Sequence, residues 1–245
     1  MSFLKLSKPV VVLLFACFVV SELHAQYPVW FIEQGRIPEP RVVVGYAQPG
    51  YRHDSTGGVA YQDALISYAR QSRVKIAGGQ IFWNTEAGSF WMGSDFSEEV
   101  DTTGLAQAAE SLAVLDSFTT PSMQALLLGP KVLELDSPLK AITEWETRAP
   151  EWIESPPVSS TDEYAVGMAP QYYYESSSWK EAERMARRNL ARSVYTTVRM
   201  LQKSGIQAQG IEHEELRVNL HDISVAARWT DVNARIVYVL MRTPK

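Results

Sequence analysis

The feature that most constrains this fold is an internal repeat at a fixed separation of 122 residues. VVVGYAQPGY (42–51) and YAVGMAPQYY (164–173) place valine, glycine, alanine and tyrosine in the same order. When each residue is compared with the one 122 positions later, 11 identities fall between positions 28 and 70 without a gap. Random pairing over that stretch would give about three. The sequence therefore predicts two copies of one folding unit.

The repeat sets the expected domain boundaries. The second copy starts near Ala149, so we expect a first domain over 26–148 and a second over 149–245. Each copy begins with a strand, at 42–47 and at 163–168, and continues into a helix. The second helix is expected from about Ser178 to Gln202. Its apolar face repeats every four residues, and the first copy has a matching row: Ala182, Ala186, Leu190, Val194, Val198; Ala60, Ala64, Tyr68, Ser72, Ile76.

The segment after the second helix changes to a period of two, which is typical of strands. LRVNL (216–220) and ISVAARW (223–229) each alternate apolar and other residues. RIVYVLMR (235–242) is apolar on both faces, as in a covered central strand. KVLEL (131–135) is expected to be one strand of the corresponding hairpin in the first copy. The predicted class is α+β, with two tandem strand–helix–antiparallel-strand units and each helix packed on one face of its sheet.

These residues resemble the LPP20 lipoprotein family, whose relatives include the N-terminal domain of the flagellar protein FlgT. The resemblance lies in the Val-Gly-x-Ala strand, the alanine-rich helix with Ala-Arg, and the terminal hairpin ISVAARWTDVNARIVYVLMR. It covers roughly 160–245, and the first copy departs from the pattern between Gly78 and Arg148. Membership would imply an exported protein of the bacterial cell envelope, often lipid-anchored, and it would imply no reaction.

Residues 1–25 have the pattern of a secretory signal peptide. Lys5 and Lys8 precede the apolar run PVVVLLFACFVV (9–20), which is short for a membrane span, and Ala25 precedes an expected cut before Gln26. A lipoprotein signal is the competing interpretation, because LFAC (14–17) is a rough lipobox. The apolar run continues beyond Cys17, whereas a lipidated cysteine is expected to be followed by a polar tether.

Charge and cysteine content exclude several classes of function. The net charge is −5 and the pI is near 5.5, so the chain has no basic nucleic-acid footprint. Cys17 is the only cysteine, so cleavage before Gln26 would leave none. Disulfides, zinc–thiolate sites and cysteine nucleophiles are then excluded from the mature chain.

Three groups of residues are candidates for reactive or metal-binding sites. SSWK (177–180) fits Ser-x-x-Lys, but no Lys-Thr-Gly follows, so a serine cap at the helix start is favoured. His213 lies in IEHEE (211–215) with His221 and Asp222 close behind, but without paired metal-ligand spacing, and a solvated loop is favoured. His53 and Asp54 have no serine nucleophile elbow beside them. We expect no enzyme activity, no cofactor and no metal.

Clusters of aromatic residues give the clearest indication of a binding surface in this sequence. QIFWNTEAGSFW (80–91) predicts a hairpin with a pair of aromatics on each arm, and QYYYESSSW (171–179) places three tyrosines in a loop. The candidate partner-binding residues are Phe82, Trp83, Phe90, Trp91, Tyr172, Tyr173 and Tyr174. The alternative is that the two copies bury these aromatics against each other.

The expected function is a non-catalytic exported envelope protein that binds a protein partner or supports an assembly. We expect the protein in the periplasm or at the periphery of the outer membrane. Association with the outer membrane is left open. The alternative function is a glycan- or small-ligand-binding protein that uses the Tyr and Trp surfaces. A glycan-binding protein should place coplanar aromatics beside carboxylates or amides in one groove, whereas a scaffold should show a flatter apolar patch and no enclosed pocket.

Overall fold

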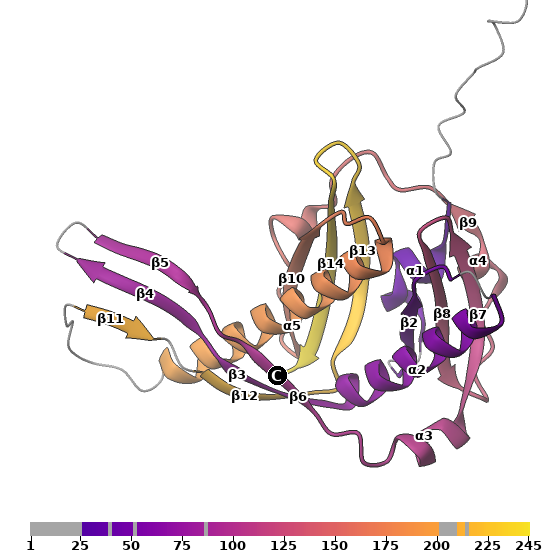
Figure 1. Cartoon of the computed structure of the whole chain (residues 1–245), viewed down its shortest axis with the longest axis horizontal. Helices are drawn as coiled ribbons and strands as arrows, with labels where there is room; N and C mark the ends of the chain where they lie inside the picture. Colours follow the sequence, from indigo (N-terminus) through magenta and orange to yellow (C-terminus); the bar gives the residue numbers. More distant parts are fainter. Residues whose placement is uncertain (1–25, 39–40, 51–52, 86–87, 201–209, 214–215) are drawn as a thin grey trace, which may run out of the picture.

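The computed structural model describes residues 26–38, 41–50, 53–85, 88–200, 210–213 and 216–245. The expected signal peptide, with Cys17, lies outside these residues. The described chain forms a body of sheets and helices from which a long arm of strands projects to one side (Figure 1). The α+β class predicted from the sequence is confirmed.

The first unit contains a three-stranded antiparallel sheet, called sheet 1, with the strand order β2-β8-β7. Helix α2 packs on one face of sheet 1 through the buried side chains of Ala60, Ala64 and Leu65. The bounds of these elements are β2 (Val43–Ala47), α2 (His53–Ser72), β7 (Leu112–Thr120) and β8 (Met123–Pro130).

The second unit contains sheet 2, with the antiparallel strand order β10-β14-β13. Helix α5 packs on it through Ala182 and Ala186, which are both fully buried. The element bounds are β10 (Asp162–Pro170), α5 (Glu175–Met200), β13 (Ser224–Asp231) and β14 (Ile236–Pro244). The order strand, helix, hairpin is therefore found in both halves of the chain, and β14 is a central strand, as predicted.

A glycine explains why each helix lies so close to its sheet. A Cβ at Gly45 would be 2.1 Å from the Ala60 carbonyl oxygen, and a Cβ at Gly167 would be 2.0 Å from the Ala182 carbonyl oxygen. Both distances are far inside van der Waals contact, so neither strand tolerates a side chain there. The two glycines and the two alanines are each separated by 122 residues.

The arm in Figure 1 is a three-stranded antiparallel ribbon in two segments. The proximal segment has the order β12-β3-β6 and the distal segment the order β11-β4-β5. The chain kinks between them at Gly78, whose φ of 108° favours glycine, and the Gly79 N–H donates to Asp95 Oδ1 at 2.8 Å. Their bounds are β3 (Arg73–Gly78), β4 (Gln80–Thr85), β5 (Gly88–Ser94), β6 (Ser97–Val100), β11 (Gly210–His213) and β12 (Leu216–His221).

Short elements complete the body and close its main core. They are β1 (Tyr27–Pro28), α1 (Val29–Ile32), η1 (Gln34–Arg36), α3 (Leu105–Ser111), α4 (Ser137–Lys140), β9 (Ile142–Thr143) and η2 (Glu151–Ile153). Trp30 and Phe31 are fully buried in this core, and Phe31 stacks edge-on against Phe118 of β7 and Trp179 of α5. Phe31, in the segment of residues 26–37 that precedes β2, thus joins the two units.

Two element assignments from the sequence are wrong. Residues 131–135 (KVLEL) form no strand, because the hairpin of the first unit is β7–β8, just before them. Ile76 does not continue the α2 row, because the helix ends at Ser72 and Ile76 belongs to β3.

Two local predictions also need correction. Helix α5 begins at Glu175, before the expected serine cap, and Ser178 Oγ instead accepts the backbone N–H of Tyr172 at 2.8 Å. Residues 210–213 form strand β11 on the arm, so the first part of IEHEE is not a loop. LRVNL is a strand, β12, but it pairs with β3 of the first half.

Candidate functional site

The predicted aromatic hairpin exists and forms the distal part of the arm (Figure 1). In its register Phe82 pairs with Trp91, and Trp83 pairs with Phe90. The side chains of Phe82, Trp83 and Trp91 lie outside the described residues, whereas that of Phe90 is described. The hairpin pairs with β11 and lies away from both units' sheets, so its backbone is not part of the core between them.

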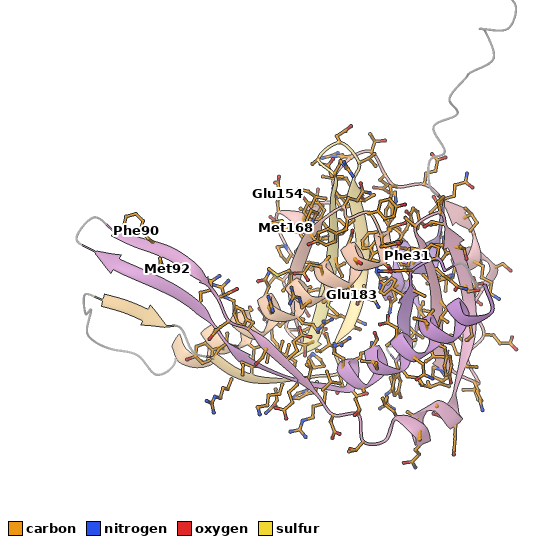
Figure 2. The ribbon with its side chains drawn as sticks, viewed as in Figure 1. Phe31, Phe90, Met92, Glu154, Met168 and Glu183 are labelled. Atoms are coloured by element: carbon orange, nitrogen blue, oxygen red, sulfur yellow. The ribbon has the colours of Figure 1, made fainter. Side chains whose placement is uncertain are left out.

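The described apolar side chains of β5 are exposed. Phe90 is 49% exposed and Met92 63% exposed, and Figure 2 labels both on the arm. Within the described residues β5 pairs only with β4, so it is an edge strand. No charged residue occurs between Gly88 and Ser94. Native edge strands are usually protected by charges or proline, so an uncharged apolar edge is unusual in a protein that acts alone.

The three candidate tyrosines lie in the loop that leads into α5, as predicted. Tyr173 is 87% exposed, and Tyr172 and Tyr174 are also exposed. The rings of Tyr173 and Tyr174 are 4.9 Å apart at an interplanar angle of 84°. Two perpendicular rings do not form the flat platform on which a sugar ring stacks.

A buried polar network, which sequence reasoning missed, connects the two units. The Arg228 guanidinium of β13 donates to Glu183 Oε1 of α5 at 2.9 Å, and the Tyr46 hydroxyl of β2 donates to the same oxygen at 2.6 Å. Arg228 also donates to the Phe31 carbonyl at 3.0 Å and to Gln34 Oε1 at 2.9 Å, both in the segment that precedes β2. Arg228 is 1% exposed, so its charge is compensated entirely inside the protein.

Burial raises the pKa of the Tyr46 phenol; the Arg228 charge lowers it and the Glu183 charge raises it, and the net direction is upward. Tyr46 therefore remains a hydrogen-bond donor at neutral pH. A protonated phenol fixed on a paired carboxylate is a structural contact between the units.

A second buried carboxylate, Glu175, ties the start of α5 to the rest of the core. It accepts from the Tyr27 hydroxyl at 2.5 Å, from Trp179 Nε1 at 3.0 Å and from Thr120 Oγ1 at 3.0 Å. Its place in the first helical turn also suits a negative charge, because backbone N–H groups point outward there. Glu175 thus fixes the base of the tyrosine loop to sheet 1.

A cavity of about 340 Å³ lies between α2, α5 and β6. Its charged side chains are paired with one another: Lys180 with Asp63 at 2.7 Å, Arg184 with Glu181 at 2.6 Å, and Arg187 with Glu98 at 3.0 Å. This pairing leaves no excess of one sign that would select a charged ligand.

A larger hollow of about 580 Å³ lies beside the end of α2 and sheet 2. Its lining mixes charged and polar groups, among them Arg41, Asp162, Asp222 and Arg242. Tyr68 is the one aromatic residue that lines it among the described residues. The exposed tyrosine loop does not contribute to this hollow.

The predicted metal candidates are not brought together where they can be described. No group of three or more His, Cys, Asp or Glu side chains able to hold a metal occurs among the described residues. The side chains of His53, Asp54 and His213 lie outside them. His221 is exposed at the end of β12, on the proximal segment of the arm.

Comparison with known proteins finds no matching family model, curated protein or solved structure. Within the described ranges, none of the helices has the length and apolar character needed to cross a bilayer.

Proposed function

We propose that this protein is a non-catalytic module of the bacterial cell envelope that binds a protein partner through the distal arm. The observation that carries the proposal is strand β5, an uncharged edge strand with Phe90 and Met92 exposed. The arm projects from the body, so a partner can reach this strand without disturbing either unit (Figure 1).

The chemistry of the strand indicates the kind of partner. An edge strand offers unpaired backbone N–H and carbonyl groups, which an extended protein segment can satisfy. Phe90 and Met92 are separated by two positions, and they would add apolar contact to such a pairing. A protein segment fits both features, whereas a sugar would use neither the backbone row nor Met92.

The glycan alternative is less well supported. It requires coplanar aromatics in one groove, but Tyr173 and Tyr174 are perpendicular, and the hollow of about 580 Å³ has Tyr68 as its one aromatic lining residue among the described residues. No observation on the described residues favours it over a protein partner.

We further propose that the two units are copies of one domain related to the LPP20 family. The common strand order and the matching contacts of Gly45 and Gly167 support duplication. The family assignment depends on the sequence resemblance alone, as does export to the periplasm or outer-membrane periphery. Mass spectrometry of the protein from the envelope tests export: a mature N-terminus at Gln26 supports a soluble protein, and an acylated Cys17 supports a lipoprotein.

Partner binding is tested by affinity capture from envelope extract with wild type and a Phe90→Ser/Met92→Ser double variant. We expect the double variant to lose one or more specific partners, because both exposed apolar contacts are removed. Val132→Ser is the matched control, since Val132 is 93% exposed on the body. Equal recovery of all proteins by the double variant would contradict the proposal.

A further inference from the structure

A small cavity of about 30 Å³, called the inner cavity, lies at the junction of the two units. Its lining comes from α2 and β2 of the first unit and from α5, β13 and β14 of the second. Three of the lining side chains are arginines: Arg70 of α2, Arg187 of α5 and Arg228 of β13. Glu183 of α5, labelled in Figure 2, is the one carboxylate that lines it among the described residues. The inner cavity is therefore surrounded mainly by positive charge.

The carboxylates near the inner cavity do not balance these three cations. Glu183 is paired with Arg228 at 2.9 Å, and Glu98 of β6 is paired with Arg187 at 3.0 Å. Arg70 has to share Glu98 with Arg187, and Arg70 Nε lies 3.6 Å from Glu98 Oε2, which is too far for a hydrogen bond. Two carboxylates thus serve three guanidinium groups, and one positive charge is left in excess.

The electrostatics of Arg70 show the same excess. Burial is the largest cause that lowers the pKa of Arg70, and the charge of Arg187 lowers it further. The carboxylates of Glu98, Glu183 and Asp63 raise it, but the net direction is downward. The charged form of Arg70 would therefore gain from one more negative charge beside it.

Two arginine N–H groups of the lining residues lack an acceptor. Arg70 Nε and Arg228 Nε are both buried, and neither makes a hydrogen bond to any residue that the structure describes. The terminal nitrogens of Arg228 donate to Glu183 and to two groups of the segment that precedes β2, so they do not share this deficit. Buried polar groups in native proteins are almost always hydrogen-bonded, so we expect an acceptor inside the cavity.

The volume limits the size of that acceptor. One water-sized particle needs roughly 10–15 Å³ of such space. A chloride ion is only slightly larger than a water molecule and can accept several N–H groups at once, whereas the four oxygens of sulfate or phosphate need more room. We propose that the inner cavity binds one chloride-sized monovalent anion, which accepts from Arg70 and Arg228 and matches the single excess charge.

The neighbouring cavity of about 340 Å³ gives the anion a route from solvent. The two cavities share four lining residues: Ser67, Arg70, Glu183 and Arg187. Lys180 and Arg184 line the larger cavity, and their side chains are 46% and 44% exposed, so the larger cavity is open to solvent. Ser67 of α2 lines both cavities, and its hydroxyl can donate to an anion that enters the inner one.

The bound anion connects the two units. Arg70 belongs to the helix of the first unit and Arg228 to a strand of the second, so one anion between them adds a contact across the junction. A ligand that binds only the folded protein stabilises it in proportion to its occupancy. The fold should therefore become more stable as chloride is added, and this effect does not depend on the arm binding a partner.

Chloride titration of the purified full chain tests the site. At constant ionic strength, replacing sodium gluconate by sodium chloride should raise the melting temperature of wild type until the site is saturated. Chlorine NMR should show line broadening that bromide displaces at lower concentration than sulfate does. Arg70→Gln removes the excess charge and one unpaired N–H group, and it should weaken chloride binding at least about tenfold. Ser67→Ala should weaken it by a smaller factor.

Arg184→Gln is the matched control. It also removes one arginine charge, but Arg184 lines only the larger cavity, so this variant should keep the chloride dependence of wild type. Circular dichroism checks that each variant folds. If Arg70→Gln does not fold, Ser67→Ala decides, and equal broadening in Ser67→Ala and wild type would then overturn the proposal.

Three further outcomes would overturn the proposal. Equal melting temperatures in the two salts, without line broadening, would mean that the cavity holds water alone. Equal chloride dependence of wild type and Arg70→Gln would mean that chloride binds elsewhere. Displacement by sulfate at least as effective as displacement by bromide would move binding to the larger cavity and contradict a site of this size.

Discussion

Tyr46 and Glu183 form a 2.6 Å hydrogen bond inside the protein, between a strand of one unit and the helix of the other. Arg228 donates to the same carboxylate from a third element. The junction between the units is therefore polar at its centre and aromatic around it, with Phe31 under the Arg228 guanidinium at 4.6 Å.

Neutralising Glu183 should destabilise the whole fold. Glu183→Gln leaves the buried Arg228 charge without its carboxylate, and removal of one partner of a buried pair typically costs about 3–5 kcal/mol. Denaturant unfolding measures the change. Arg184→Gln is the control, because the Arg184–Glu181 pair is partly exposed and should be worth about 1 kcal/mol or less. Equal stability of both variants would show that the buried pair does not hold the units together.

The helix–sheet contact in each unit should not accept a methyl group. Gly167→Ala places a Cβ 2.0 Å from the Ala182 carbonyl oxygen, well inside van der Waals contact, so it should cost at least about 1–3 kcal/mol. Ala64→Leu and Ala186→Leu should overpack the same contacts by about 1–3 kcal/mol. Gly58→Ala in α2 is the control: nothing lies within 4 Å of its added Cβ, and it should stabilise by about 0.5–1 kcal/mol. Melting temperatures that rank the two glycine variants in the opposite order would contradict this packing.

Stability should fall at alkaline pH because of two buried tyrosines. Burial is the largest cause that raises the pKa of Tyr27 and of Tyr46, so each phenol is held neutral in the folded protein. Their contribution is fully present below the unfolded pKa of about 10 and is lost as pH rises above it, by up to about 1.4 kcal/mol per pH unit for each group. Unfolding free energies between pH 8 and 11 measure the slope. Tyr46→Phe should make it shallower, Tyr173→Phe should leave it unchanged, and an identical slope in both would be inconsistent with a buried Tyr46 phenol.

The tryptophans of the arm should matter for binding and not for folding. The distal segment of the arm lies away from sheets 1 and 2, so Trp83→Ala and Trp91→Ala should leave the melting temperature nearly unchanged. If the arm binds a partner, at least one of these truncations should weaken the binding free energy by about 2 kcal/mol or more. Loss of fold in both variants would instead place the hairpin in the core.

The repeat explains how much of this fold could be predicted from sequence. Gly45 packs against Ala60 of the following helix, and Gly167 packs against Ala182 of its own. These contacts fix strand and helix in both units, because close packing there tolerates nothing larger. The β7–β8 hairpin was missed because a bulge between Val114 and Asp116 breaks the alternation that marks a strand.

The polar junction was missed for a related reason. A bulge between Val225 and Ala227 shifts the parity of β13, so Arg228 faces the core although the sequence pattern placed it outside. The pairing of β12 with β3 joins residues more than 130 positions apart, and no local pattern specifies it. The aromatic hairpin was predicted correctly because its signal, paired aromatics around a turn, is local.

Site-specific photo-crosslinking in intact cells tests the proposed function most directly. A photoreactive amino acid at Phe90 should give a discrete adduct with a protein partner, because this side chain is exposed on the uncharged edge strand. The same amino acid at Val158, which is fully exposed on the body, is the control and should not give that adduct. An adduct specific to position 90 is the predicted result. Absence of any adduct at position 90, or the same adducts at both positions, would contradict a partner-binding arm.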